Sequence, residues 1–264
     1  MIRWALAILA LALGAPALAA SKVNPYPPPG MMENACPASR EGLWALDPKV
    51  LASDWAWLCR YAEANARIDP ANPPQVVFIG DSITENWVQL DPGLFGKTRL
   101  GRGISGQTSP QMLVRFWQDV IALKPRVVHI MAGTNDIAGN TGPTTPEAYK
   151  NAIRAMVTLA EANGIVVILG SIPPADTFGW AIQHKPAVWI AGLNGWLKNF
   201  AAEHGAVYAD YFTPLAGPNG ELRPEFGPDG VHPNAAGYAV MRPVAEAAIN
   251  QAEAIAAGRD AAQY

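Results

Sequence analysis

Charged residues, cysteine and histidine are all scarce in this sequence. Lysine, arginine, aspartate and glutamate make up 16% of the 264 residues, and the formal net charge is −3. Lysine and arginine are scattered, so the chain lacks the clustered positive charge that nucleic-acid binding requires. The two cysteines and four histidines form no grouping with metal-ligand spacing. We therefore expect no nucleic-acid partner and no bound metal.

The sequence also lacks an apolar run of the roughly 20 residues that a membrane span needs. The run from Trp4 to Leu13 is shorter, follows Arg3, and precedes the small-residue site Ala17-Leu18-Ala19. This order is typical of a signal peptide. Residues 1–20 are therefore predicted to be cleaved, and the mature protein to be periplasmic or secreted without stable membrane insertion. An uncleaved anchor is the alternative, and the absence of a cysteine after the cleavage site argues against a lipoprotein.

Both cysteines, Cys36 and Cys59, lie after the predicted leader. An oxidising compartment permits such residues to pair, so we expect a disulfide, with two buried thiols as the alternative. Residues 21–37 are rich in proline and are expected to run as an extended strap. Asp47 and Pro48 are typical of a helix start, and a helical period of apolar residues continues to about Ala62.

From residue 75 onward, strand-like segments alternate with helix-like segments. Short apolar runs predict five strands, at Val76–Ile79, Thr98–Ile104, Val127–Met131, Ile165–Leu169 and Ala206–Tyr208. Start signals predict helices between and after them, capped by Ser109 and Thr145 or beginning near Pro186 and Asn234. Parallel strands require such crossover helices. The fold class is therefore α/β, a three-layer α/β/α sandwich around a five-stranded parallel sheet.

Polar residues follow several of these strands at the point where each strand ends. Ser82 follows the first strand, Gly106 the second and Asn135 the third, and Asp229 and His232 lie in a long loop after the fifth. Ligands bind outside the carboxyl ends of the strands in such sheets, so these residues are expected to converge on one edge. Each alone is explained as a helix cap or turn residue. Their joint occurrence, in an order that fits one reaction, favours a functional site.

Other polar residues near these positions are expected to be structural. Asp81 and Asp136 flank Ser82 and Asn135 and are expected to brace their turns. His129 lies inside a predicted strand and is expected to be a core histidine. His184 and His204 have no carboxylate three residues before them, and we assign them no role.

Four short blocks closely resemble the GDSL or SGNH hydrolase superfamily. They are GDSI at 80–83, GISGQTS at 103–109, GTND at 133–136 and DGVHP at 229–233. The resemblance extends over about residues 75 to 245 and implies the flavodoxin-like SGNH hydrolase fold. We expect residues 71–264 to form the catalytic domain and residues 21–70 to form an N-terminal strap and helix packed on it. The usual leucine after the serine is Ile83 here, an apolar variation. The G-x-S-x-G elbow of ordinary lipases is absent.

The resemblance also implies roles for the five residues at the strand ends. Ser82 would be the nucleophile, and Asp229 and His232 would complete a catalytic triad. The oxyanion hole would use the N–H groups of Ser82 and Gly106 and the side-chain amide of Asn135. Such a reaction needs no metal and no organic cofactor.

Gly106 is preferred to Gly103 as the oxyanion-hole donor because it directly precedes the polar residues Gln-Thr-Ser.

We therefore expect an exported serine esterase that hydrolyses a carboxylic ester through an acyl-enzyme. The segments around the active edge contain no long amphipathic helix for lipid docking, which favours a short acyl group, such as acetyl, on a carbohydrate or polar alcohol. Trp87, Phe178, Trp180 and Trp189 are expected to border the cleft and offer flat surfaces for stacking on sugar rings. For the last three, which lie in the loop 173–189, packing against the loop itself is the alternative. The alternatives are a lysophospholipase or thioesterase of the same superfamily, or a non-catalytic binding module on this scaffold.

Overall fold

The computed structural model describes Cys36 and residues 46–261. The chain divides into two units, residues 1–38 and 39–264, and the architecture below is that of the second unit. The predicted signal peptide and most of the predicted proline strap lie outside the described residues.

A five-stranded parallel sheet forms the centre of this unit. The strands are β1 (Val76–Gly80), β2 (Arg99–Gly103), β3 (Val127–Met131), β4 (Val166–Gly170) and β5 (Val207–Ala209), in the spatial order β2-β1-β3-β4-β5. All five predicted strands are present, with ends that differ by about one residue. The order is that of flavodoxin-like folds, in which the connections diverge between β1 and β3 and leave a crevice for ligands.

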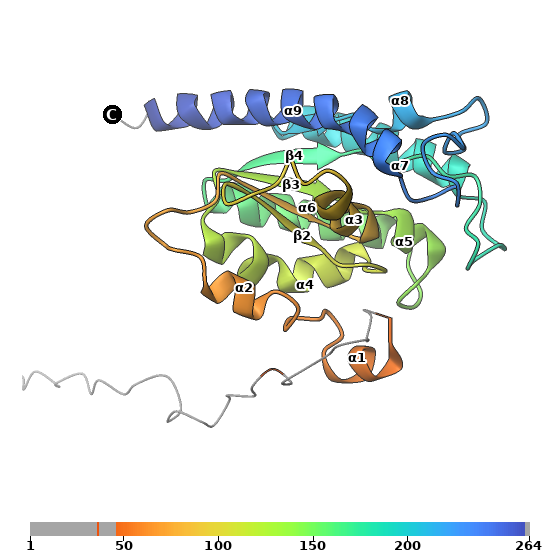
Figure 1. The fold of residues 1–264 in the computed structure, drawn as a ribbon, viewed down its shortest axis with the longest axis horizontal. Helices are drawn as coiled ribbons and strands as arrows, with labels where there is room; N and C mark the ends of the chain where they lie inside the picture. The colour runs from red at the N-terminus through yellow and green to blue at the C-terminus, as the bar shows by residue number, and fades with distance from the viewer. Residues whose placement is uncertain (1–35, 37–45, 262–264) are drawn as a thin grey trace, which may run out of the picture. The chain divides into compact units, whose positions relative to one another are not determined.

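Helices cover both faces of the sheet (Figure 1), which confirms the predicted three layers. The helices of the core are α3 (Ser82–Leu90), α4 (Ser109–Asp119), α5 (Thr134–Ala138), α6 (Pro146–Ala162), α7 (Pro186–Glu203), α8 (Phe212–Leu215) and α9 (Ala235–Ala261), with a 3₁₀ turn at Ile121–Leu123. Alternate strand residues point to opposite faces. Val77 and Ile79 of β1 therefore pack with α4, α6 and α7, whereas Val76 and Phe78 pack with α3 and α9.

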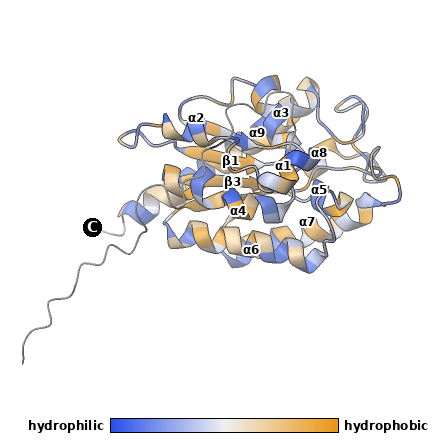
Figure 2. Ribbon diagram, turned by 90° about the horizontal axis from the view of Figure 1, so that it is seen from below, coloured by the Kyte–Doolittle hydropathy of each residue, from blue (hydrophilic) through white to orange (hydrophobic). Residues whose placement is uncertain are grey.

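The apolar character of the strands explains why the sheet is covered on both sides. Every residue of β1, β3 and β4 is buried, and Figure 2 shows β1 and β3 as mainly hydrophobic while the helices carry hydrophilic patches. A sheet with two apolar faces buries both of them against helices. The core thus holds the carboxyl ends of β1, β2 and β3 in fixed register at one edge.

One of two predicted helix caps is confirmed and the other is wrong. Thr145 caps α6, as predicted, and its hydroxyl accepts a hydrogen bond from Ala148 N–H at 3.0 Å. The predicted cap Ser109 is wrong by one residue, because Thr108 caps α4 through reciprocal hydrogen bonds with Gln111. Ser109 is instead the first residue of the helix.

The predicted helix from Pro48 to about Ala62 is wrong, because the structure breaks it in two. Helix α1 (Pro48–Ser53) begins after Asp47 as predicted, and helix α2 (Ala62–Ala66) follows a turn region. The carboxylate of Asp54 accepts hydrogen bonds from the backbone N–H groups of Leu58 and Cys59. Such side-chain bonds to the backbone compete with the helix.

The structure contains a disulfide, and both Cys36 and Cys59 are disulfide-bonded. This agrees with the sequence prediction and indicates an oxidising compartment. Within residues 46–261, no helix is both long enough and apolar enough to cross a membrane.

We predict that thiol titration of the denatured, unreduced mature protein will find no free cysteine. The disulfide closes a loop of about 24 residues, for which loop entropy contributes about 3.5 kcal/mol to the free energy of unfolding. Reduction should therefore lower the urea midpoint, and alkylated protein should show the same decrease. Two titratable thiols in the unreduced protein would contradict the pairing.

Candidate active site

Three side chains that are distant in the sequence meet at the carboxyl edge of the sheet. Ser82 Oγ lies 2.9 Å from Nε2 of His232, and Nδ1 of His232 lies 2.7 Å from Oδ2 of Asp229. Ser82 begins α3 shortly after β1, whereas Asp229 and His232 lie in the loop before α9. The structure thus brings together the serine, the histidine and the carboxylate that the sequence singles out, in hydrogen-bonded order.

The turn that carries Asp229 and His232 is closed by the aspartate itself. Its Oδ1 accepts hydrogen bonds from the backbone N–H groups of Val231 at 2.9 Å and His232 at 2.8 Å. Partial burial opposes ionisation, but the backbone N–H groups of His232 and Val231 and the imidazole together hold the pKa of Asp229 below its usual value. An ionised Asp229 accepts the Nδ1 proton of a neutral imidazole, which leaves Nε2 as the acceptor toward Ser82.

Asp81 caps helix α3 immediately before Ser82. Its Oδ1 accepts a hydrogen bond from Ile83 N–H at 2.9 Å, and its Oδ2 lies 3.3 Å from Nδ2 of Asn135. Burial raises the pKa of Asp81 to about 6, against the lowering effects of the Ile83 N–H and of His232. Asp81 therefore braces the turn that presents Ser82, in agreement with the sequence analysis.

Asp136 braces a second turn of the site. Its carboxylate accepts hydrogen bonds from Ser109 N–H at 3.0 and 3.1 Å and from the Ser109 hydroxyl at 2.6 Å. Burial raises the pKa of Asp136 to about 6, although the bonds from Ser109 act in the opposite direction. The start of α5 is thereby joined to the start of α4.

The two remaining residues singled out from the sequence, Gly106 and Asn135, lie at the same edge. Gly106 has φ +82°, and a Cβ there would lie 2.8 Å from Cγ of Leu46, so both conformation and space favour glycine. Nδ2 of Asn135 donates to the carbonyl oxygen of Gln107 at 3.0 Å. The loop after β2 is therefore linked directly to the loop after β3.

Asn140 completes this link and was not singled out from the sequence. Its Nδ2 donates to Oδ1 of Asn135 at 2.6 Å, and its Oδ1 accepts from Nε1 of Trp180 at 2.9 Å. These two bonds orient the amide of Asn135. Asn140 belongs to none of the four sequence blocks, and no local pattern marks it.

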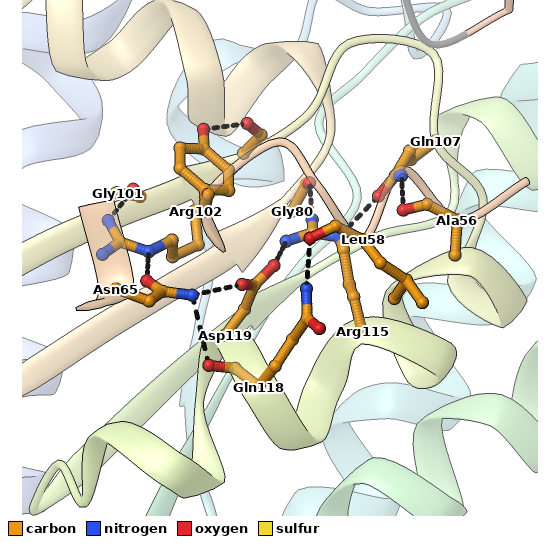
Figure 3. Close-up of polar contacts among 12 residues, drawn as sticks. Ala56, Leu58, Asn65, Gly80, Gly101, Arg102, Gln107, Arg115, Gln118 and Asp119 are labelled. Carbon is orange, nitrogen blue, oxygen red and sulfur yellow. Dashed lines mark hydrogen bonds and ion pairs between the residues drawn. The ribbon is translucent and has the colours of Figure 1, made fainter. Parts of the chain in front are cut away.

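A buried arginine lies behind the site and joins three segments (Figure 3). Arg115 of α4 donates from Nη2 to the carbonyl oxygen of Gly80 at 2.9 Å and from Nε to Oε1 of Gln107 at 2.6 Å. Its Nη1 pairs with Asp119 at 3.1 Å, and both side chains are fully buried. Burial lowers the pKa of Arg115, and Asp119 opposes that effect. Arg115 thus joins the end of β1 to the loop after β2.

The same network extends to the segment before β1. Nδ2 of Asn65 donates to Asp119 at 2.7 Å, and Oδ1 of Asn65 accepts from Nε of Arg102 at 2.9 Å. Gln107 also donates from Nε2 to the carbonyl oxygen of Ala56 at 2.7 Å. Side-chain amides therefore attach residues 54–66 to α4 and to the loop that contains Gly106 (Figure 3).

Two of the four aromatic residues expected at the cleft are in the core instead. Trp87 is fully buried, because it shares the inner face of α3 with Ile83 and stacks on Tyr238 of α9. Phe178 is also fully buried and lies beneath Trp180. The expectation that Trp87 borders the cleft was therefore wrong. For Phe178 the alternative holds, because its ring packs against Trp180 of the same loop.

The other two aromatic residues are exposed, and one of them lies at the triad. Trp180 is 49% exposed, and its ring centroid lies 6.3 Å from that of His232. Trp189 is exposed and lines a cavity of about 420 Å³ together with His184 and several residues between Asp136 and Pro146. The cavity lies between the loop after β3 and the start of α7.

In the described part of the chain, the other three histidines, His129, His184 and His204, form no hydrogen bond with the triad. His129 is buried in β3 and hydrogen-bonds Tyr211 at 2.9 Å, and burial lowers its pKa to about 3. It is a core histidine, as the sequence predicts. Across the described part of the chain, no group of three His, Cys, Asp or Glu side chains is arranged to hold a metal.

The sequence of residues 78–240 matches the model of the GDSL-like Lipase/Acylhydrolase family. No curated protein matches the chain significantly.

Solved structures share both the fold and much of the sequence. A proposed acylhydrolase from Bacteroides fragilis is 46% identical, with a TM-score of 0.71, over 75% of this chain and 98% of its own. A GDSL-like lipase from Bacteroides thetaiotaomicron is 42% identical, with the same TM-score and the same coverage. An acetylxylan esterase from Geobacillus stearothermophilus shares the fold at 21% identity and a TM-score of 0.52, over 66% of this chain and 93% of its own.

We predict that Arg115→Met lowers the free energy of unfolding by about 3–5 kcal/mol, because it leaves the carboxylate of Asp119 buried without its cationic partner. The double variant Arg115→Met/Asp119→Leu should recover a large part of this loss. Urea unfolding of the wild type, both single variants and the double variant measures the coupling.

Arg126→Met is the matched control, because the ion pair of Arg126 with Asp260 is exposed and should contribute less than about 1 kcal/mol. If the effects of the Arg115 and Asp119 substitutions simply add, the two residues are not coupled and the prediction is wrong.

Proposed function

The chain belongs to the GDSL-like lipase/acylhydrolase family, and we propose that it is an exported serine esterase whose catalytic triad is Ser82, His232 and Asp229. Membership of this family makes the chain an ester-hydrolysing enzyme. The observation that carries the residue roles is the chain of hydrogen bonds from Ser82 Oγ through both ring nitrogens of His232 to Asp229.

In the proposed reaction, His232 acts first as a base and then as an acid. Its Nε2 takes the proton of Ser82 as Oγ attacks the acyl carbon, and Asp229 stabilises the resulting imidazolium. Collapse of the tetrahedral intermediate breaks the ester bond, and Nε2 gives its proton to the leaving alcohol oxygen. Water then attacks the acyl carbon of the acyl-enzyme as Nε2 of His232 takes one of its protons. The bond between the acyl carbon and Ser82 Oγ breaks, and Nε2 returns the proton to Oγ, which releases the carboxylic acid and restores Ser82.

We assign the oxyanion hole to the N–H groups of Ser82 and Gly106 and to the side-chain amide of Asn135. Such a donor contributes about 3–4 kcal/mol to lowering the barrier. The 3.3 Å contact from Nδ2 of Asn135 to Asp81 is long for a hydrogen bond. A substrate oxygen would replace that contact, while the shorter bonds to Gln107 and Asn140 keep the amide in place.

The proposed substrate is a short-chain acyl ester, such as an acetyl ester, of a carbohydrate or polar alcohol. Trp180 supports this proposal, because it presents an exposed ring next to His232 and flat aromatic surfaces suit sugar rings. The acetylxylan esterase with the same fold indicates that this scaffold is compatible with an acetylated glycan.

The second candidate is a lysophospholipase or thioesterase activity. The 420 Å³ cavity, which Asp136 also lines, favours it, because Leu193, Pro143 and Trp189 offer apolar contacts to a longer acyl chain. A non-catalytic binding module would not need the hydrogen-bonded triad, and the family assignment also argues against it. The length of the preferred acyl chain distinguishes the first two candidates.

Export rests on the predicted signal peptide and on the disulfide. The disulfide indicates an oxidising compartment, which agrees with a periplasmic or secreted enzyme.

We predict that Ser82→Ala lowers kcat for 4-nitrophenyl acetate by at least about a thousandfold, because it removes the nucleophile. Thermal stability should stay nearly unchanged, since only one small hydroxyl is lost. Asp229→Asn should be milder than His232→Ala, because the imidazole remains.

Ser53→Ala is the control, because its hydroxyl bonds Lys49 on the exposed helix α1. A fluorophosphonate should label Ser82 in the wild type and in this control but not in Ser82→Ala. A label on any other serine would overturn the assignment.

We also predict that, in a series of 4-nitrophenyl esters from acetate to palmitate, kcat/KM is highest at about two to four carbons. If the acyl pocket is shallow, added methylenes gain little of the burial energy of about 0.8 kcal/mol each and soon clash. A maximum at eight carbons or more would refute the short-acyl substrate and favour the lysophospholipase or thioesterase alternative.

A further inference from the structure

The loop between β4 and α7 brings an aromatic ring to the triad. Trp180 lies in this loop, and its ring centroid is 6.3 Å from the His232 ring, with 31° between the ring planes. Trp180 is also 49% exposed. An indole that is both exposed and adjacent to the proposed acid-base group is available to a ligand at the reacting centre.

The ring of Trp180 is held in place from two sides. It stacks on the buried ring of Phe178, with centroids 5.2 Å apart and 21° between the planes. Its Nε1 donates a hydrogen bond to Oδ1 of Asn140 at 2.9 Å. A ring fixed in this way loses little conformational entropy when a ligand binds to it.

The proposed reaction determines which part of the substrate meets this ring. His232 gives its proton from Nε2 to the oxygen of the leaving alcohol, so that oxygen must come within hydrogen-bonding distance of Nε2. The alcohol portion of the ester therefore lies beside His232, the residue whose ring is next to the exposed ring of Trp180. The acyl portion stays with Ser82 and the oxyanion donors.

We propose that Trp180 forms the subsite for the alcohol portion of the ester, and that this portion is a sugar ring. The proposal rests on the proposed esterase function and adds the group that recognises the alcohol. The indole offers one flat apolar face, which fits the C–H face of a pyranose. Phe178 lies behind Trp180 and is buried, so the two rings do not form the walls of an aromatic cage that would favour a quaternary ammonium group.

Trp180 is also connected to the proposed oxyanion donor. Asn140 accepts from Trp180 and donates to Oδ1 of Asn135 at 2.6 Å. A change at Trp180 would therefore alter acetyl transfer from every ester to some extent. A comparison of two acetyl esters that differ only in the alcohol cancels this common effect.

The test uses a methyl xyloside triacetate and ethyl acetate, whose alcohol is too small to cover the indole. We expect Trp180→Ala to lower the ratio of kcat/KM for the sugar ester to that for ethyl acetate by about tenfold, mainly through KM. Trp180→Phe keeps an aromatic face and should lower the ratio by less than about threefold. Trp117→Ala is the matched control, because Trp117 is an exposed tryptophan in the C-terminal half of α4, and it should leave the ratio unchanged.

Binding is measured separately, in a Ser82→Ala background that does not turn over. Calorimetric titration with the xyloside triacetate should show binding that is weakened about tenfold by adding Trp180→Ala and little changed by adding Trp117→Ala. If the wild type hydrolyses ethyl acetate and neither the ratio nor the affinity depends on Trp180, the subsite is refuted and the esterase function stands.

If the wild type hydrolyses neither ester, the proposed function fails, and the titration alone decides whether Trp180 binds the sugar. Acetylcholine serves as a third substrate. If Trp180→Ala lowers kcat/KM for acetylcholine but not for the xyloside triacetate, the sugar assignment is overturned in favour of a cationic alcohol.

Discussion

The arrangement of the site depends on one buried guanidinium, that of Arg115. An arginine keeps its charge in proteins, so its burial is tolerated only where its donors meet acceptors. Here they meet the carbonyl of Gly80, the side chain of Gln107 and the carboxylate of Asp119. These acceptors belong to the end of β1, the loop after β2 and helix α4. The carbonyl of Gln107 also accepts a hydrogen bond from Asn135. The same contacts therefore position the segment after β3, which carries Asn135.

Local patterns in the sequence were sufficient for the strands and for the residues that meet at the sheet edge, because buried parallel strands are continuous apolar runs. The burial of Trp87 could also have been predicted, because Trp87 lies four residues after Ile83 and therefore on the same face of the helix. The break at Asp54 comes from local bonds of its carboxylate to the N–H groups of Leu58 and Cys59, which the apolar periodicity of the segment does not reveal. The burial of Arg115 depends on contacts with distant segments, and a lone arginine in an amphipathic helix is usually on the solvent side.

Two buried carboxylates, those of Asp81 and Asp136, stabilise helix starts at the site and also contribute to its charge. Asp81 caps α3, and Asp136 lies in the first turn of α5. Burial raises the pKa of each carboxyl group to about 6. Above that pH both are ionised, and their charges are accommodated by backbone N–H groups of helix starts. An ionised Asp81 attracts the positive charge of His232, and this attraction opposes the rise in the pKa of Asp81. Protonation of Asp81 below about pH 6 would weaken that attraction.

The segment before β1 lies outside residues 78–240, which match the family, yet it is part of the support of the site. Leu46 occupies the space next to Gly106, and the carbonyl of Ala56 accepts from Gln107. The same segment contains Cys59, which is disulfide-bonded. The contacts of Leu46 and Ala56 therefore join the segment that contains Cys59 to the loop that holds Gly106.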